Sequence, residues 1–362
     1  MKILLLGEYS NVHWTLAQGL RNLGHEVCVV SNGDFWKDYP RDIDVARKAG
    51  KIGGIILILK LWSLLPKMRG YDVVQLINPM FFELKAERLF WFYRYLRHHN
   101  KRVFLGAFGM DYYWVHECIN HKPLRYSDFN IGDELRTNKD ALKECADWLG
   151  TAKEHLNMLI ANDCDGIITG LYEYDVCYRS NFPEKTQFIP YPITPASLPT
   201  PLTSNTPIRI FIGISKQRSA YKGTDIMLAA AEEIVRKYPQ QAVLIKTEGV
   251  PFEQYQHLMD SSDVLLDQLY AYTPAMNALL AMSKGIVVVG GGEIENYEIL
   301  GEKDLRPIVN VEPNYDSVYH ELEQLVLHPE RIPELKRQSV EYIKKHHDFI
   351  KVAMQYVDFW NR

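Results

Sequence analysis

Three basic side chains share one short stretch of the chain and could together hold an anion. Lys216, Arg218 and Lys222 lie between an apolar run that ends at Gly213 and a segment with helical apolar spacing, 226–237. The N-terminus of a helix has unpaired N–H groups that favour anions, and added cations strengthen this preference. The stretch therefore predicts a diphosphate-binding loop, although it lacks the GxxxxGK(S/T) spacing of ATPases. The alternative is a basic loop that only faces solvent.

A glycine-rich loop in the same half of the chain is a second candidate. The β-branched run 286–289 is typical of a strand buried on both faces, and Gly291 and Gly292 follow it. Glycines at the end of such a strand let the backbone come close to a ligand. Glu293 and Glu295 come next, either to bind sugar or ribose hydroxyls or only to complement a helix dipole.

Three polar side chains near this loop are expected to face the same ligand. Tyr272, Thr273 and Asn277 follow a predicted strand, 264–266, and lead into a predicted helix. Ligands of open α/β sheets bind at the carboxyl ends of the strands. We therefore expect all three to face a cleft.

The first half of the chain has its own candidates at two predicted strand ends. Gly7 ends the first strand and precedes Asn11 and His13, and Gly109 and Asp111 follow another strand. Gly7 is either a tight turn or room for a ligand, and the two are compatible. Asp111 is an exposed loop acid, a helix N-cap or a contact for a substrate hydroxyl. For His13 we favour a packed surface histidine over a ligand contact.

The elements that must position these residues form a repeating α/β pattern. A single glycine after the first strand makes a nicotinamide or flavin site a weak prediction. At 362 residues, two domains are the default. We predict two Rossmann-like, doubly wound domains facing a cleft, with a C-terminal helix that crosses back to the first. The predicted divisions are 1–190, a proline-rich linker 191–206, a second domain 207–345 and a tail helix 346–362.

Composition narrows the classes of partner. The net charge is −4, which argues against a large nucleic-acid footprint. Five scattered cysteines without a CxxC pair indicate reduced thiols in a cytoplasmic protein. No zinc-ligand spacing and no acidic DxD motif is evident, so we expect no metal at the site. The start of the chain is too short for a signal peptide, and the apolar run 52–65 is too short to span a bilayer.

Two basic, apolar segments, 48–69 and 84–102, are predicted to be mostly helical. Helices that cover a sheet explain both, and we favour that interpretation. Basic amphipathic segments also rest on anionic lipid, so peripheral contact with the inner membrane face is the alternative prediction.

The order and spacing of several short motifs resemble retaining glycosyltransferases of the GT-B type (group 1, family 4-like). The matching stretches are GHEV at 24–27, YDVV at 71–74, KG at 222–223, AM with a following glycine at 281–285, and GGxxE at 291–295. The resemblance covers nearly the whole length. It implies transfer of a sugar from a nucleoside-diphosphate sugar to a carbohydrate or lipid-linked acceptor, with retention. It also implies a role in cell-surface polysaccharide or glycoconjugate synthesis, without metal or other cofactor.

The resemblance also assigns roles to residues. Lys222 is similar to the family's lysine on the donor diphosphate, and Arg218 stands for the arginine usually upstream. The family's Glu-x7-Glu pair falls on Tyr272 and Leu280, so this motif has diverged. We hypothesise that Glu293, Glu295 or Asn277 replaces the lost hydroxyl contacts. The catalytic candidates are Arg218, Lys222 and Glu295.

The remaining candidates fall into two groups. The donor-binding group is Gly213, Lys216, Tyr272, Thr273, Asn277, Gly291, Gly292 and Glu293, and the acceptor-side group is Gly7, Asn11, His13, Gly109 and Asp111. Two alternatives stay open. One is a sugar-nucleotide epimerase on the same scaffold, which would need acid–base groups around the sugar. The other is a non-catalytic protein that binds sugar nucleotides.

Overall fold

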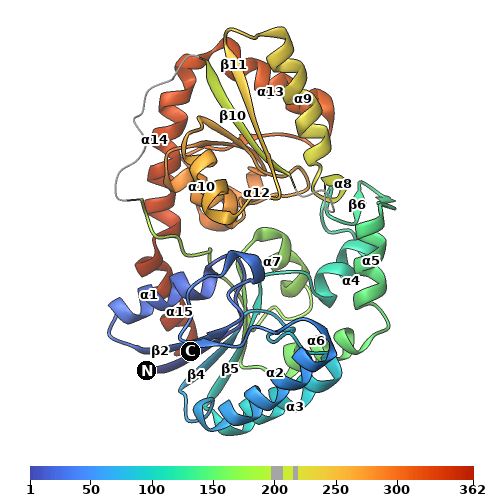
Figure 1. Ribbon diagram of the computed structural model, residues 1–362, viewed down its shortest axis with the longest axis vertical. Helices are drawn as coiled ribbons and strands as arrows, with labels where there is room; N and C mark the ends of the chain where they lie inside the picture. The colour runs from blue at the N-terminus through green and yellow to red at the C-terminus, as the bar shows by residue number, and fades with distance from the viewer. Residues whose placement is uncertain (197–206, 215–218) are drawn as a thin grey trace.

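The computed structural model describes residues 1–196, 207–214 and 219–362, and it contains two parallel sheets (Figure 1). The first sheet lies in the lower half of Figure 1 and the second in the upper half. Each sheet is covered by helices on both faces. The predicted two-domain α/β fold is therefore confirmed, while the exact domain limits stay predictions.

The N-terminal sheet has seven strands in the order β3-β2-β1-β4-β5-β8-β9. Its strands are β1 Lys2–Leu6, β2 Glu26–Ser31, β3 Ile43–Asp44, β4 Val73–Leu76, β5 Arg102–Ala107, β8 Gly166–Thr169 and β9 Thr186–Phe188. Its helices are α1 Val12–Asn22, α2 Gly50–Leu64, α3 Ala86–His99, α4 Tyr112–Asn120, α5 Lys139–Trp148, α6 Ala152–Asp163 and α7 Tyr172–Arg179, with 3-10 turns at Phe35–Lys37 and Leu65–Lys67. A small hairpin, β6 Asn130–Ile131 with β7 Glu134–Leu135, interrupts the stretch between α4 and α5.

Strand β1 shows why the N-terminal strands read as continuous apolar runs. Ile3 and Leu5 pack in one apolar cluster with α1 and α15, whereas Leu4 and Leu6 pack in another with α2, α3 and α6. A strand covered on both faces buries every side chain, so its sequence does not alternate.

The C-terminal sheet has five strands in the order β11-β10-β12-β13-β14. Its strands are β10 Ile208–Ile214, β11 Ala242–Glu248, β12 Val264–Leu266, β13 Val287–Gly290 and β14 Val309–Asn310. The helices of this half are α8 Ser219–Lys222, α9 Thr224–Lys237, α10 Phe252–Asp260, α11 Met276–Ser283, α12 Ile294–Leu300, α13 Tyr315–Leu327 and α14 Ile332–Tyr342, with a 3-10 turn at Pro329–Arg331. Helices α9 and α13 share a core cluster on one face, and α11 lies with the cluster on the other.

The end of the chain crosses back to the N-terminal half, as predicted (Figure 1). A π-helical turn, Ile343–His347, carries the chain from α14 into α15 Phe349–Trp360. Helix α15 packs on α1 at Gly19, where a Cβ atom would lie 2.3 Å from the carbonyl oxygen of Phe349. Beside this crossing, the amide of Ile193 donates to the carbonyl of His347 at 2.7 Å. The second half of the predicted linker, 197–206, lies outside the described residues.

The predicted strands all form, and the structure adds the short strand β3 and the β6–β7 hairpin. These two elements have two residues per strand, too few for an apolar period to be visible in the sequence. In the described part of the chain, every helix is too short or too polar to cross a membrane.

Candidate functional site

Two adjoining cavities lie between the carboxyl ends of the two sheets. The larger, about 1520 Å³, is lined mainly by the N-terminal half, and the smaller, about 930 Å³, mainly by the C-terminal half. Both are lined by Lys37 from the first half and by Lys222 and Gln268 from the second. Since neither half closes these cavities alone, a ligand held here touches both domains.

The β1–α1 loop forms the N-terminal wall where the sequence predicted it. Gly7 has φ +83°, and a Cβ there would lie 2.3 Å from the Ile77 side chain, so the turn requires glycine. Gly7 and Gly109 line the larger cavity, and Asn11 lines the smaller one. Asn11 caps α1 in the left-handed region, with φ 71°. The prediction of a tight turn that leaves room for a ligand fits this geometry.

His13 is not the surface residue that the sequence favoured. Its side chain is fully buried, its Nδ1 lies 2.8 Å from the carbonyl oxygen of Gly7, and burial lowers its pKa to about 3. The imidazole is therefore neutral, and its Nδ1–H donates to that carbonyl. His13 lines neither cavity, so it positions the loop from behind.

Glu8 is a cavity residue that the sequence analysis missed. Its carboxylate accepts from the backbone amides of His13 at 3.2 Å and Trp14 at 2.9 Å, at the start of α1. Glu8 is buried in the wall of the larger cavity, and burial raises its pKa to about 8. A carboxyl group with such a pKa exchanges protons near neutral pH.

Of the three roles predicted for Asp111, the structure shows the helix N-cap. One carboxylate oxygen accepts from the amide of Trp114 at 2.9 Å, and the other accepts from the Tyr178 hydroxyl at 2.8 Å. Burial raises the pKa of Asp111 to about 7. It is fully buried and lines neither cavity. Its role is to start α4 rather than to face the cleft.

The C-terminal wall is built around Lys222, which ends α8 directly before the left-handed Gly223. Asp267 lies in the wall of the smaller cavity, where burial raises its pKa and the charge of Lys222 opposes that rise. Asn277 donates to Asp267 at 3.1 Å and accepts from the Tyr255 hydroxyl at 3.1 Å. Asn277 and Lys222 both line the smaller cavity, and their parts in donor binding stay predictions.

Two buried polar atoms behind the wall of the smaller cavity have no hydrogen-bond partner among the described residues. They are Oδ1 of Asn11, from the first half, and Oγ1 of Thr247, at the end of β11 in the second half. A buried polar atom without a partner is costly, and such atoms mark places where water or a ligand completes the structure. Both belong to residues of the cavity wall, one from each half, and a water or ligand group that reached them would supply the missing partner.

Gly213 lines the smaller cavity where β10 ends, and a Cβ there would lie 2.5 Å from the Tyr255 ring. Lys216 and Arg218, the other members of the predicted diphosphate loop, lie outside the described residues. Their parts in the site stay predictions.

Tyr272 and Thr273 face the N-terminal half and not an open cleft. Their backbone amides donate to one oxygen of Glu173, at 2.5 and 3.0 Å, and the Thr273 hydroxyl donates to the other. Both residues and Glu173 are buried. Glu173, on α7, is a contact between the halves that the sequence analysis missed.

Glu293 and Glu295 extend the same contact. The guanidinium of Arg125 donates to Glu293 at 2.7 Å and also to Glu295. The Arg125 amide donates to the Tyr272 hydroxyl at 2.7 Å, and the Tyr126 hydroxyl donates to Glu293 at 2.5 Å. We name this contact the interdomain bridge; it consists of Arg125, Tyr126, Glu173, Tyr272, Thr273, Glu293 and Glu295.

The glycine loop serves packing in this structure. A Cβ at Gly291 would lie 2.3 Å from the Ala271 carbonyl oxygen, and the Gly292 amide donates to Asn310 at 2.9 Å. Gly291, Gly292, Glu293 and Glu295 line neither cavity. Backbone approaches backbone here, whereas the sequence analysis expected backbone to approach a ligand. Any part of these residues in donor binding stays a prediction.

A second contact between the halves comes from the stretch of the N-terminal half that also carries Arg125. Arg136, next to the β6–β7 hairpin, donates to the carbonyls of Ala220 at 2.7 Å and Tyr221 at 3.1 Å. Its guanidinium carbon lies 3.4 Å from the centre of the Tyr270 ring. The hairpin lies beside α8 at the right of Figure 1. Arg125 and Arg136 both lie in 119–137, a long polar stretch whose length and composition are typical of a functional loop.

Comparison with known proteins identifies the fold. No protein-family model and no curated protein sequence matches this chain. Sucrose-phosphate synthase from Thermosynechococcus elongatus is similar over 100% of this chain and 98% of its own, with a TM-score of 0.63 and 12% identity. Anabaena HepE in complex with UDP and glucose has a TM-score of 0.59 and 12% identity, over 99% of this chain and 98% of its own. UDP-GlcNAc 2-epimerase from Neisseria meningitidis bound to UDP-GlcNAc has a TM-score of 0.53 and 13% identity, over 99% of each chain.

The fold is accordingly the GT-B arrangement of two facing Rossmann-like domains. At this level of identity the likeness shows the fold alone.

Proposed function

We propose that this protein is a glycosyltransferase that moves a sugar from a nucleoside-diphosphate sugar to a carbohydrate or lipid-linked acceptor. The observation that carries the proposal is the smaller cavity, whose wall combines Lys222 with the polar side chains of Asp267, Asn277 and Tyr255. A ligand with an anionic centre and hydroxyl groups complements this wall. The motif resemblance and the UDP and glucose bound by HepE support the same class of ligand.

In this proposal Lys222 neutralises the diphosphate as the bond to the sugar breaks. The positive charge and the amides at the start of α9 stabilise negative charge that grows on the leaving group, so the contribution is electrostatic. Arg218 and Lys216 add cations to the same loop. Anomeric retention and a hexosyl donor belong to the proposal through the family resemblance.

Aromatic rings at the mouth of the smaller cavity offer a place for the nucleobase. Trp36 of the first half lies edge-on to Phe252 of the second, with ring centres 6.0 Å apart, and both line the cavity. A base can stack on such rings whatever its identity. The larger cavity, with Gly7 and Gly109 in its wall, then receives the acceptor.

The acceptor is proposed to be presented at a membrane. Helix α2 exposes Ile52, Ile55, Leu59 and Trp62, and Trp62 stacks on the exposed Trp91 of α3 at 5.2 Å. The same two segments, 48–69 and 84–102, carry exposed basic residues: Lys48, Lys51, Lys60, Lys67, Arg69, Arg88 and Arg94. Apolar and cationic side chains together fit an anionic lipid surface. This face supports a role in cell-surface polysaccharide or glycoconjugate synthesis at the inner membrane face.

Sedimentation with anionic vesicles tests the membrane contact. Leu59→Glu is expected to reduce binding, whereas Met354→Glu, at an exposed apolar position on α15, is expected to leave it unchanged. If both variants bind the vesicles equally, the apolar face of α2 is not the membrane contact.

A thermal-shift screen against UDP, GDP, ADP and their sugars tests the proposed function. A ligand that binds only the folded protein raises the melting temperature by mass action. One nucleotide is expected to stabilise the wild type and to lose this effect in Lys222→Ala. The control is Lys246→Ala, an exposed lysine on β11. Stabilisation that survives Lys222→Ala, or no response to any nucleotide, contradicts the proposal.

The second candidate is a sugar-nucleotide epimerase, and one observation favours it. Glu8 supplies the cavity with an acid–base group of the kind that the sequence analysis did not find. Incubation of the stabilising sugar nucleotide without acceptor separates the two. An isomerised sugar nucleotide indicates the epimerase, and unchanged substrate that reacts only with acceptor indicates the transferase. Binding without turnover in either assay indicates the non-catalytic alternative.

A further inference from the structure

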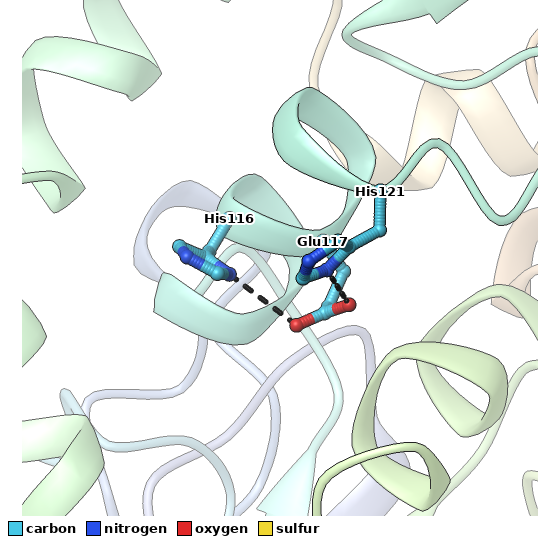
Figure 2. Close-up of side chains that lie close together, drawn as sticks. All are labelled: His116, Glu117 and His121. Carbon is cyan, nitrogen blue, oxygen red and sulfur yellow. Dashed lines mark hydrogen bonds and ion pairs between the residues drawn. The ribbon is translucent and has the colours of Figure 1, made fainter.

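Three side chains of types that commonly bind metal ions lie close together near the end of α4, outside both cavities. They are His116, Glu117 and His121, and their candidate ligand atoms all lie within 4.8 Å of one another. Figure 2 shows both imidazole rings turned toward the Glu117 carboxylate. The cluster does not stand out in the sequence, because it follows none of the known metal-ligand spacings.

The spacing of the ligand atoms fits a small ion. Nδ1 of His116 lies 3.3 Å from one oxygen of Glu117, and Nδ1 of His121 lies 2.7 Å from the other. Four tetrahedral ligands at bond lengths of about 2.0–2.1 Å lie roughly 3.3 Å apart. The two Nδ1 atoms face different oxygens of Glu117, so binding of one ion requires the exposed His121 side chain to rotate.

The surroundings of Glu117 are those of a fixed ligand. Its carboxylate is buried, while the side chains of His116 and His121 are 31% and 63% exposed, so an ion can enter from solvent. Asn181 donates to the first oxygen of Glu117 at 3.0 Å and orients it. Such an outer hydrogen bond is what holds metal-binding carboxylates in place.

We propose that His116, Glu117 and His121 bind one divalent transition-metal ion of the Zn²⁺ class. Each imidazole binds through Nδ1 with its proton on Nε2, and water takes the fourth position. Two nitrogen ligands favour Zn²⁺ over Mg²⁺ and Ca²⁺, which take oxygen ligands. The site is separate from the proposed sugar transfer, which uses no metal.

The position of the site gives the ion a structural role. His121 directly follows α4, and the chain turns at Lys122 with φ 47° into the segment that carries Arg125 and Arg136. Both arginines contact the C-terminal half. An ion at His121 therefore fixes the start of the segment whose two arginines contact the C-terminal half.

Calorimetric titration of the metal-free protein with Zn²⁺ tests the proposal. One equivalent is expected to bind and to raise the melting temperature. Glu117→Gln and His121→Ala are expected to abolish this binding, and Asn181→Ala is expected to weaken it by about tenfold. The control is His328→Ala, which removes an exposed histidine 3.3 Å from Glu330 but without a second histidine.

Two outcomes would overturn the proposed metal site. No Zn²⁺ binding by the wild type overturns the proposal. Binding that His121→Ala and His328→Ala weaken equally also overturns it, because that result describes scattered surface histidines. Glu117→Gln keeps the shape of the side chain, so a loss of binding with an unchanged melting temperature of the metal-free protein excludes unfolding as the cause.

Discussion

The smaller cavity and the interdomain bridge are both polar contacts between the two halves, but they differ in how their polar groups are satisfied. In the bridge, the buried Glu173 accepts three hydrogen bonds, and Arg125 spans Glu293 and Glu295. In the wall of the smaller cavity, buried atoms of Asn11 and Thr247 find no partner among residues 1–196, 207–214 and 219–362. Polar groups that hydrogen-bond to one another stabilise the fold, whereas buried polar groups without a partner mark places where water or a ligand can bind. We therefore propose that the smaller cavity binds the ligand and that the bridge holds the two halves together, although its Glu173 also lines the larger cavity.

Removing Glu173 is expected to have the largest effect on stability. Glu173→Ala leaves the buried amides of Tyr272 and Thr273 without an acceptor, at about 1–3 kcal/mol for each unsatisfied group. Chemical denaturation should show a lower free energy of unfolding. Unchanged stability would mean that the bridge does not hold the halves together.

Removing Lys222 is expected to have the largest effect on binding. A hydrogen bond to a charged group contributes about 1.5–3 kcal/mol, so Lys222→Ala should weaken nucleoside-diphosphate binding by roughly 10- to 100-fold. Calorimetry measures this loss, with Lys246→Ala as the control. Stability in the absence of ligand is expected to change little. Equal affinity of wild type and Lys222→Ala would remove the lysine from the site.

The bridge also predicts a pH dependence. Burial raises the pKa of Glu173 above its ordinary value of 4.5, so the folded state keeps the proton to higher pH than the unfolded state. The contribution of the protonated carboxyl group to stability is fully present below pH 4.5 and is lost as pH rises through the higher folded pKa. Glu173→Gln cannot titrate. Its stability relative to wild type, measured by chemical denaturation, should therefore increase from pH 4.5 upward, and a constant difference would contradict the raised pKa.

Thr247 offers a smaller change within the cavity. Thr247→Val keeps the shape and removes a hydroxyl that has no partner in the part of the chain that the structure describes. Ligand binding should weaken by about 0.5–1.5 kcal/mol, the net worth of one hydrogen bond, while the ligand-free protein should be no less stable. Reduced stability without a change in binding would give Thr247 a structural role instead.

Arg125 is expected to have the smallest effect. Its side chain is 55% exposed, and ion pairs between exposed groups contribute about 0–1 kcal/mol. Arg125→Ala should lower the melting temperature slightly, and less so at high salt. A loss as large as that of Glu173→Ala would mean that the exposed part of the bridge matters as much as its buried part.

The parts of the site that depend on local chemistry could be predicted from the sequence. Lys222 was found because a strand, a basic loop and a helix follow one another in the chain, and Asn277 because it follows a strand end. Tyr272 and Thr273 were placed near the right strand but given the wrong neighbour. Their partner Glu173 lies about 100 residues away, and no local pattern shows such a contact.

Glycine was the most ambiguous signal. The absence of a side chain at Gly291 allows close approach, and the sequence cannot tell whether a ligand or another backbone segment approaches. The apolar runs predicted the strands well because burial on both faces leaves a strong composition signal. His13 was misplaced because burial of a histidine depends on the carbonyl of Gly7, which only the folded loop supplies.

The most direct test of the account compares the dissociation constant of the stabilising nucleoside diphosphate for Thr247→Val and Glu295→Ala. The sequence analysis predicts that Glu295 contacts the donor, whereas the structure pairs it with Arg125 outside both cavities. If the cavity binds the ligand and the bridge does not, affinity falls in Thr247→Val and equals that of the wild type in Glu295→Ala. If Glu295→Ala binds more weakly while Thr247→Val keeps full affinity, the assignment of ligand binding to the cavity rather than to the bridge is contradicted.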